Sequence, residues 1–134
     1  MNAKSIIFTL TVTTLVVVGC SKKIDPNVGG FQCLAKARIA LQAGDTQTAK
    51  KYIDTLRIQY PMALNAREWG ILVLDSVNLS EAYMQVSTIE NTLRKVQLTC
   101  IGKDTIEFNL DEAKEKVKFF ERKIEHDKVK KTNH

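Results

Sequence analysis

Apolar residues recur at helical spacing between residues 46 and 60. Four of them lie four, three and four positions apart, which places them on one face of an α-helix: Ala49, Ile53, Leu56 and Tyr60. The hydroxyl of Thr46 or Thr48 can cap the first turn of this helix by accepting a bond from an unpaired backbone N–H. Pro61 ends it, because proline has no N–H to donate and disfavours the helical conformation of the residue before it.

A second helix is predicted just upstream, over Phe31–Ala43, where the strong helix formers alanine and leucine are frequent. Gly44 ends this helix, because glycine tolerates the left-handed conformation of a helix C-cap. Five small residues let the two helices approach closely: Ala35, Ala37, Ala40, Ala43 and Ala49. The pattern therefore predicts a helical hairpin with its turn at Gly44-Asp45.

Residues 62–79 are predicted to form a third helix with Trp69 and Leu72 on its apolar side. We expect Trp69, the only tryptophan, to pack in the core between helices, because an indole buries a large apolar area. The alternative is an exposed Trp69 that anchors a partner in a binding groove.

Two longer apolar stripes follow the heptad spacing of helices that pack side by side. The first lies in a helix that Ser80 would cap and consists of Ala82, Val86, Ile89, Leu93, Val96 and Cys100. The second lies in a helix over 110–129 and consists of Leu110, Ala113, Val117, Phe120 and Ile124. Asn109 and Glu112 form a capping box at its start.

Residues 101–109 connect these two stripes, with a short extended piece expected at 105–108. A connection of this length predicts an antiparallel helical hairpin. Phe119 lies beside the second stripe and indicates either a second packing partner or an exposed apolar spot.

The segment around the first hairpin resembles a tetratricopeptide repeat, a helix–turn–helix unit of about 34 residues. The first copy matches the repeat at its turn, its small residues and its closing proline: Gly44-Asp45, Ala37, Ala49 and Pro61. A second copy departs from the pattern. Trp69-Gly70 precedes Ala82 by twelve residues, but Val77-Asn78 stands at the turn and no proline closes the unit.

The resemblance implies an all-α fold of tetratricopeptide-like helix pairs over residues 31–79. The hairpin over 80–131 completes the same domain, and residues 132–134 form a tail. A chain of 134 residues holds one such domain at most.

The first twenty residues carry the features of a secretory signal peptide. Lys4 gives a positive start, and residues 6–18 form an apolar run shorter than the ~20 residues that span a bilayer. The run ends in Val17-Val18-Gly19-Cys20, which resembles the lipobox of bacterial lipoproteins. That resemblance implies diacylglycerol on the Cys20 sulfur, removal of residues 1–19 and acylation of the new N-terminus. An ordinary signal-anchor with an incidental cysteine is the alternative.

Residues 20–30 are predicted to be a short polar tether, with Asp25-Pro26 and Gly29-Gly30 as breakers. Ser21 stands where an aspartate would resemble an inner-membrane retention signal, so the resemblance implies the outer membrane. Lys22-Lys23 differs from the acidic stretch of some surface-exported lipoproteins, which favours the periplasmic face. Two or three acyl chains hold a protein stably on a bilayer.

The chain has 20 basic and 15 acidic residues, and loss of Lys4 with the signal peptide leaves a net charge of +4. This balance suits an anionic lipid surface or an acidic partner. The predicted compartment and the lack of a basic run with interleaved aromatic residues exclude nucleic acid as a partner. The charged segment 121–134 is predicted to be a solvated helix end, with a lipid or acidic-partner contact as the alternative.

Cys33 and Cys100 remain after lipidation of Cys20. A disulfide between them is one alternative in an oxidising periplasm, and two buried free thiols are the other. His126 and His134 lack metal-ligand spacing with any carboxylate or thiol cluster, so no metal site is predicted. The sequence has no triad-like arrangement and no glycine-rich phosphate loop, so we predict neither a catalytic residue nor a cofactor.

The resemblance implies a protein-binding or scaffold module, because such repeats line a concave groove with their first helices. Polar residues on the outward faces of the first and third helices are the candidate partner contacts: Arg38, Gln42, Asn65, Arg67 and Glu68. The Tyr60-Pro61 ending with Ala63 and Ala66 is also similar to repeats in the lipoprotein that accompanies outer-membrane barrel assembly. That similarity implies a role in envelope assembly.

Two other functions stay open at this point. The first is a coiled-coil lipoprotein that self-associates through residues 80–129. The second is a small-ligand carrier, which would need a cavity that the sequence does not reveal.

Overall fold

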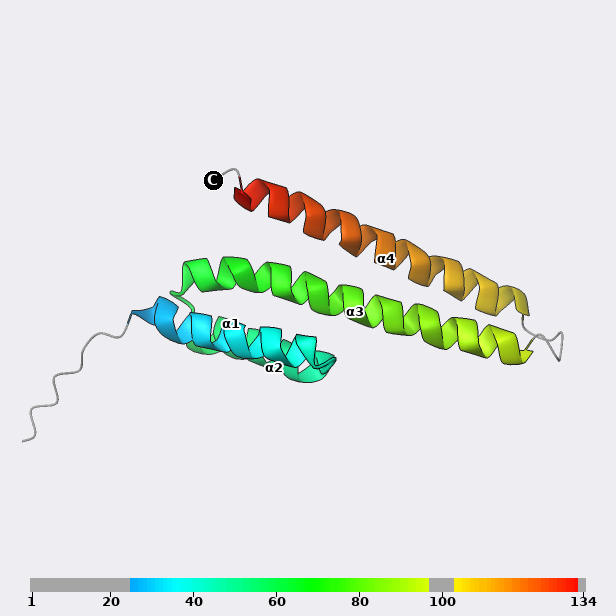
Figure 1. Ribbon diagram of the computed structural model, residues 1–134, viewed down its shortest axis with the longest axis horizontal. Coiled ribbons are helices and arrows are strands. Elements are labelled where there is room, and N and C mark those ends of the chain that lie inside the picture. Colours follow the sequence, from blue (N-terminus) through cyan, green and yellow to red (C-terminus); the bar gives the residue numbers. More distant parts are fainter. Residues whose placement is uncertain (1–24, 97–102, 133–134) are drawn as a thin grey trace, which may run out of the picture.

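The computed structural model describes residues 25–96 and 103–132, of which 92% are helical and none is in a strand. Four helices follow one another along the chain: α1 (Pro26–Gln42), α2 (Thr46–Gln59), α3 (Leu64–Val96) and α4 (Lys103–Thr132). Figure 1 shows them as an elongated assembly in which α3 is the central element. The predicted all-α class is confirmed.

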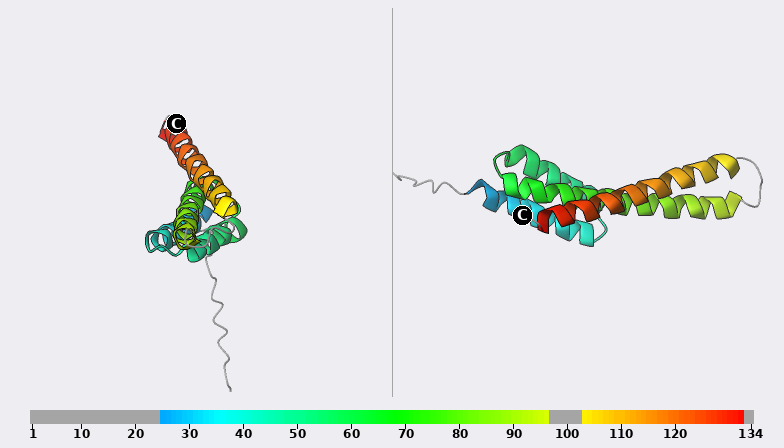
Figure 2. Two further views of the ribbon diagram at one scale, coloured as in Figure 1. Left: turned by 90° about the vertical axis from the view of Figure 1, so that its right-hand side faces the viewer. Right: turned by 90° about the horizontal axis from the view of Figure 1, so that it is seen from above.

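The helix α3 has different neighbours on its two sides. Its first half packs against α1 and α2, which form an antiparallel pair, and α4 runs back along α3 in the opposite direction. Among the described helices, α4 contacts α3 alone. Figure 2 shows that α4 crosses α3 obliquely, and that the far halves of both helices project beyond α1 and α2.

The first hairpin forms as the sequence predicts, because its signals are local. The periodic residues Ala49, Ile53 and Leu56 of α2 are all buried. Gly44 takes the left-handed conformation, with φ of 78°, just after α1 ends. The cap of α2 differs from the prediction: Asp45 rather than a threonine accepts the Thr48 N–H, at 2.9 Å. The hydrogen bonds from Thr48 lower the pKa of Asp45.

The helix α1 begins at Pro26, five residues before the predicted start, so the segment from Pro26 to Gly30 is not a tether. Asp25 caps it by accepting the Asn27 N–H at 2.8 Å. Gly29 and Gly30 were expected to break the chain, but both lie inside the helix and are buried. Their missing side chains serve close packing instead of a turn.

The contacts of Gly30 show how close this packing is. A Cβ atom on Gly30 would lie 2.7 Å from the Ala63 Cβ and 2.9 Å from the Ala66 Cβ. A Cβ atom on Gly29 would overlap the ring of Tyr60. Only glycine therefore lets the start of α1 lie directly on the turn between α2 and α3.

The helix α3 runs without a break through Val77-Asn78, where the second repeat was predicted to turn. Residues 71–96 contain neither glycine nor proline, so nothing in them interrupts a helix. Val77 is fully buried against Ala40 and Ala49 as an interior residue of α3, and Ser80 caps no helix. The prediction of a second helix–turn–helix copy is therefore wrong.

The helix α4 also exceeds its prediction at both ends. It begins at Lys103, so residues 105–108 are helical rather than extended and Asn109 is not a cap. Of the predicted stripe, Leu110, Ala113 and Ile124 are buried, and Val117 and Phe120 are partly buried. The helix continues to Thr132, and most side chains from Glu121 onward are exposed, as the prediction of a solvated helix end requires, but Lys123 and Lys131 contact α3.

One cysteine of the predicted pair lies in the described part of the chain. Cys33 is buried and packs with Leu56 and Ala66. Because Cys100 lies outside the described residues, the alternatives of a Cys33–Cys100 disulfide and two free thiols stay predictions.

The close approach at Gly30 leads to a prediction about stability. Gly30→Ala gains up to about 1 kcal/mol of helix propensity, but overpacking costs about 1–3 kcal/mol. We expect a net loss of unfolding free energy of about 1–2 kcal/mol, measured by urea denaturation of the domain without its signal peptide.

The matched control is Gln32→Ala, at an exposed position of the same helix. It should change the unfolding free energy by less than about 0.5 kcal/mol. A Gly30→Ala protein that is more stable than the parent would mean that α1 does not lie on Ala63 and Ala66.

Candidate functional site

A concave site lined by two helices lies where the beginning of α3 and the end of α4 diverge. This cleft has a volume of about 590 Å³ and is open to solvent. Both helices line it with apolar and charged side chains: Glu68, Trp69, Ile71, Leu72, Asp127, Lys130 and Lys131. We refer to it as the Trp69 cleft.

Trp69 is 41% exposed, so the prediction of a core position is wrong and the alternative of an exposed tryptophan holds. Trp69 is exposed because of the direction in which its side chain leaves the α3 axis. Gly70 faces Leu56 in the core, and a neighbouring residue points about 100° away around the helix axis. The buried face of α3 is thus occupied by Gly70, Val73 and Val77, and the indole is left at its edge.

Lys131 of α4 covers one face of this indole. Its ammonium nitrogen lies 4.4 Å from the centre of the Trp69 ring, a cation–π geometry. The same nitrogen donates to the backbone oxygen of Glu68 at 2.8 Å and lies 3.7 Å from its carboxylate. Lys131 is therefore fully engaged, whereas the exposed Lys130 and Lys128 form no ion pair with any described residue.

An ion pair between a buried carboxylate of α3 and a half-exposed lysine of α4 helps to set the position of α4 over α3. The carboxylate of Asp75 is 5% exposed, and both of its oxygens accept from the Lys123 ammonium at 2.7 Å. Farther along α3, the Tyr83 hydroxyl donates to Glu121, which lies two residues before Lys123 on α4, and this bond raises the pKa of Tyr83. These contacts fix the register that brings Lys131 onto Trp69.

The five predicted partner contacts are not brought together into a groove. Arg38 and Gln42 are exposed on α1, and no hydrogen bond or ion pair joins them to the predicted residues of α3. Arg67 donates to the backbone oxygen of Pro61 at 2.8 Å, which stabilises the turn before α3. Asn65 is exposed, and Glu68 alone lines the Trp69 cleft.

Lys130 and Lys131 were missed as site residues. The sequence signal for them was present, because the charged segment 121–134 carries both, but nothing in the sequence links it to Trp69. That link depends on the crossing of α3 and α4, which joins residues 62 positions apart.

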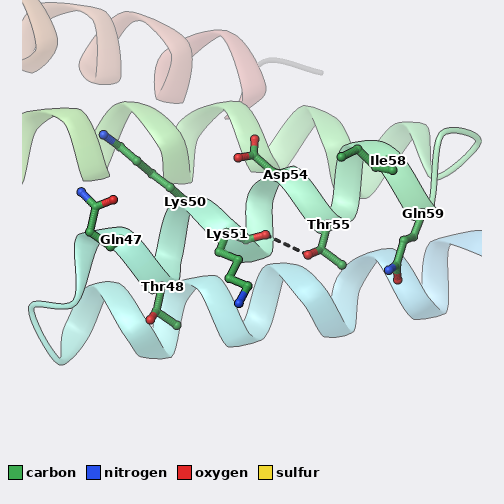
Figure 3. Close-up of a pocket in the computed structure, with 8 residues that line it drawn as sticks. All are labelled: Gln47, Thr48, Lys50, Lys51, Asp54, Thr55, Ile58 and Gln59. Carbon is green, nitrogen blue, oxygen red and sulfur yellow. Dashed lines mark hydrogen bonds between the residues drawn. The ribbon is translucent and has the colours of Figure 1, made fainter.

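A second hollow lies on the outer face of α2, shown in Figure 3. All eight lining residues come from this one helix, from Gln47 to Gln59. Thr55 donates to the backbone oxygen of Lys51 at 2.8 Å, and Lys50 and Gln47 at one end of the hollow reach Glu81 of α3. A depression between two rows of side chains on a single helix encloses nothing, so it supports no ligand site.

The side chains of the Trp69 cleft are suited to binding a ligand or a surface. It combines an apolar ring with ammonium groups, which suits an amphiphilic surface or ligand of negative charge. Within residues 25–96 and 103–132 no group of three histidine, cysteine or acidic side chains could hold a metal ion. None of the described helices is long and apolar enough to cross a membrane.

No protein-family model, curated protein or solved structure matches this chain. Its function is therefore inferred from its own residues and geometry.

The ion pair of Asp75 leads to a second prediction. Lys123→Met leaves the Asp75 carboxylate buried without its partner, and an unsatisfied buried group costs about 1–3 kcal/mol. We expect a loss of that size in urea denaturation. Lys118→Met removes the same charge from an exposed pair with Glu115 on the same helix, and it should have almost no effect. Equal effects of the two substitutions would mean that Asp75 is not buried under α4.

Proposed function

We propose that this chain is a lipid-anchored protein of the bacterial envelope, held at the periplasmic face of the outer membrane through Cys20. Its helical domain acts as a scaffold that presents one end to a protein partner. The lipobox-like Val17-Val18-Gly19-Cys20 supports the anchor; Cys20 itself lies outside the described residues. The tether before α1 reduces to the four residues 21–24, because Asp25 already caps that helix.

The scaffold role is supported by the difference between the two ends of the domain. The start of α1 lies at one end, and α3 and α4 project beyond α1 and α2 at the other (Figure 1). Lys50 and Gln47, near the start of α2, both reach Glu81, at 2.6 and 3.5 Å. From Ala82 to Val96, α3 continues for about 21 Å with α4 as its one described neighbour.

This projecting pair of helices, which we call the arm, comprises residues 82–96 and 103–121. Its heptad residues Val86, Ile89 and Leu93 are only half-buried, because a single partner helix covers one side of each. Four large apolar side chains on the arm are exposed: Tyr83, Met84, Phe108 and Phe119. Apolar surface of this kind on a projecting element favours contact with another protein.

Small residues pack between α1, α2 and the start of α3 in the first helix pair, which supports a tetratricopeptide-like role for it in this proposal. In this proposal the pair supports the arm and connects it to the anchor. A groove across two repeats is not proposed, because α3 has no second turn. A carrier of small ligands is also not favoured, since the hollows among the described residues are open to solvent.

Self-association through the arm is the second candidate function. It is favoured by Phe119, which is 57% exposed and packs edge-to-face on Phe120, with their ring centres 5.1 Å apart. A second copy of the arm would cover the same half-buried stripe, as in a four-helix assembly.

The anchor leads to a third prediction. Cys20→Ala removes the thiol that would carry the lipid, so the protein should lose labelling by radioactive or clickable fatty acid and leave the membrane fraction. The control is Cys33→Ala, which should keep both properties because its thiol is buried in the helical core. Labelled fatty acid in the Cys20→Ala protein would contradict the anchor.

The arm leads to a fourth prediction. A photo-cross-linking amino acid at Phe119, in cells at native expression, should give a discrete covalent adduct, because this exposed position would face the partner. The same residue at Ile39, which is 65% exposed on α1, is the control and should give none.

The mass of the adduct separates the two candidate functions. Twice the mass of the chain indicates self-association, and any other discrete mass indicates a different envelope protein. Adducts at Ile39 and none at Phe119 would mean that the outer face of α1, beside Arg38 and Gln42, is the working surface.

A further inference from the structure

We propose that the end of the domain nearest the anchor docks on the anionic surface of the membrane and so holds the arm away from the bilayer. We call this end the basal end and define it by residues 25–31, 57–69 and 127–132. The inference rests on the proposed lipid anchor at Cys20. It adds a contact, an orientation and a ligand class, the negatively charged lipid headgroup.

The length of the chain before α1 limits where the basal end can be. Asp25 caps α1, and five residue steps separate it from Cys20. Five steps of extended chain span at most ~18 Å. A domain that is anchored at Cys20 therefore keeps the start of α1 within that distance of the lipid headgroups, and the rest of the basal end lies beside it.

The first and the last described residues of the chain both lie at the basal end. The beginning of α1 lies on the turn between α2 and α3 through Gly30, Ala63 and Ala66. The end of α4 reaches the beginning of α3 through Lys131 and Glu68. Figure 1 and the right-hand view of Figure 2 show these segments at the same end of the elongated domain.

Charge is distributed unevenly along the domain. The basal end together with residues 21–24 carries seven basic and three acidic residues, whereas the rest of residues 20–134 carries twelve of each sign. The whole positive excess of the anchored protein therefore lies within reach of the membrane. Basic residues near an anionic surface gain roughly a fivefold partitioning each, within about a Debye length of it.

Exposed apolar side chains follow the same distribution. The described residues include thirteen large apolar side chains that are exposed, and seven belong to the basal end: Val28, Phe31, Ile58, Met62, Leu64, Trp69 and Val129. The basal end makes up about a quarter of the described residues, so these side chains are concentrated there. Indole rings favour the boundary between headgroups and acyl chains, and lysines beside them extend toward the phosphates.

These contacts would be weak for a free protein, because the net charge of the basal end is small. The lipid anchor changes this, since a short tether keeps the basal end at a high effective concentration beside the headgroups. An acidic protein has no comparable constraint that would bring it to this end. The membrane surface is thus the occupant that the tether, the charge and the apolar side chains all favour.

The test uses the intact lipidated protein in vesicles and the fluorescence of Trp69, the only tryptophan of the chain. One lipid in the vesicles carries a nitroxide on its headgroup, which quenches an indole that lies close to it. With phosphatidylglycerol present, we expect quenching of Trp69 at least about twofold stronger than in phosphatidylcholine alone, and we expect 1 M salt to abolish the difference.

A pair of variants isolates the basal charge. Lys128→Gln with Lys130→Gln should lower the quenching in anionic vesicles to the phosphatidylcholine value. The matched control, Arg94→Gln with Lys95→Gln, removes the same charge from exposed positions on the arm and should leave the quenching unchanged. Circular dichroism checks that both proteins keep their helices, since none of these four side chains forms an ion pair with a described residue.

Vesicle flotation separates the two ways of failing. Protein that does not float with vesicles contradicts the anchor at Cys20. Protein that floats but shows the same Trp69 quenching with and without phosphatidylglycerol overturns the docking and leaves the anchor intact, and the Trp69 cleft would then be free for a protein partner. Equal effects of the basal and control variants would also overturn it.

Discussion

The close approach of α1 to the turn between α2 and α3 is the contact on which the rest of the arrangement depends. Gly29 and Gly30 place the backbone of α1 against Tyr60, Ala63 and Ala66, at distances that no larger residue allows. This contact makes α1 parallel to α3 and determines where the chain enters the domain. Because the entry point lies at one end of α3, everything that extends along α3 in the other direction leads away from it. A helix that began at Phe31, beyond these glycines, would have left that entry point undefined.

The helix α3 serves two cores that do not touch each other. One side packs on α1 and α2 through small and branched residues such as Ala66 and Val77, and the other meets α4 through Asp75. The two sides differ in chemistry: the first is almost wholly apolar, and the second combines a thinner apolar stripe with ion pairs. Apolar packing of small residues needs close contact but little specificity of register, whereas a buried carboxylate requires its lysine at one position along α4. The register of α4 is therefore set by charge more than by shape.

The sequence predicted the local features well and the long-range ones poorly. The hairpin around Gly44 and the end of α2 at Pro61 could be predicted, because a left-handed glycine and a proline act within a few residues of themselves. The buried stripe of α4 was also predictable from its period. The packing role of Gly30 was not, because a glycine looks the same in sequence whether it breaks a helix or lets another backbone approach. Nor could Trp69 be assigned to the surface, since its neighbour Lys131 comes from the far end of the chain.

The uninterrupted course of α3 has a mechanical consequence. A single helix of 33 residues is about 50 Å long and has no hinge of the kind that a second interhelical turn would have provided. Braced along its length by α4, it acts as a rigid lever whose pivot is the start of α3. A tilt of about 10° at one end moves the other end by roughly 9 Å, given the helix length set by its rise per residue. Small changes in how the domain sits on its support would thus become large displacements of whatever the opposite end holds.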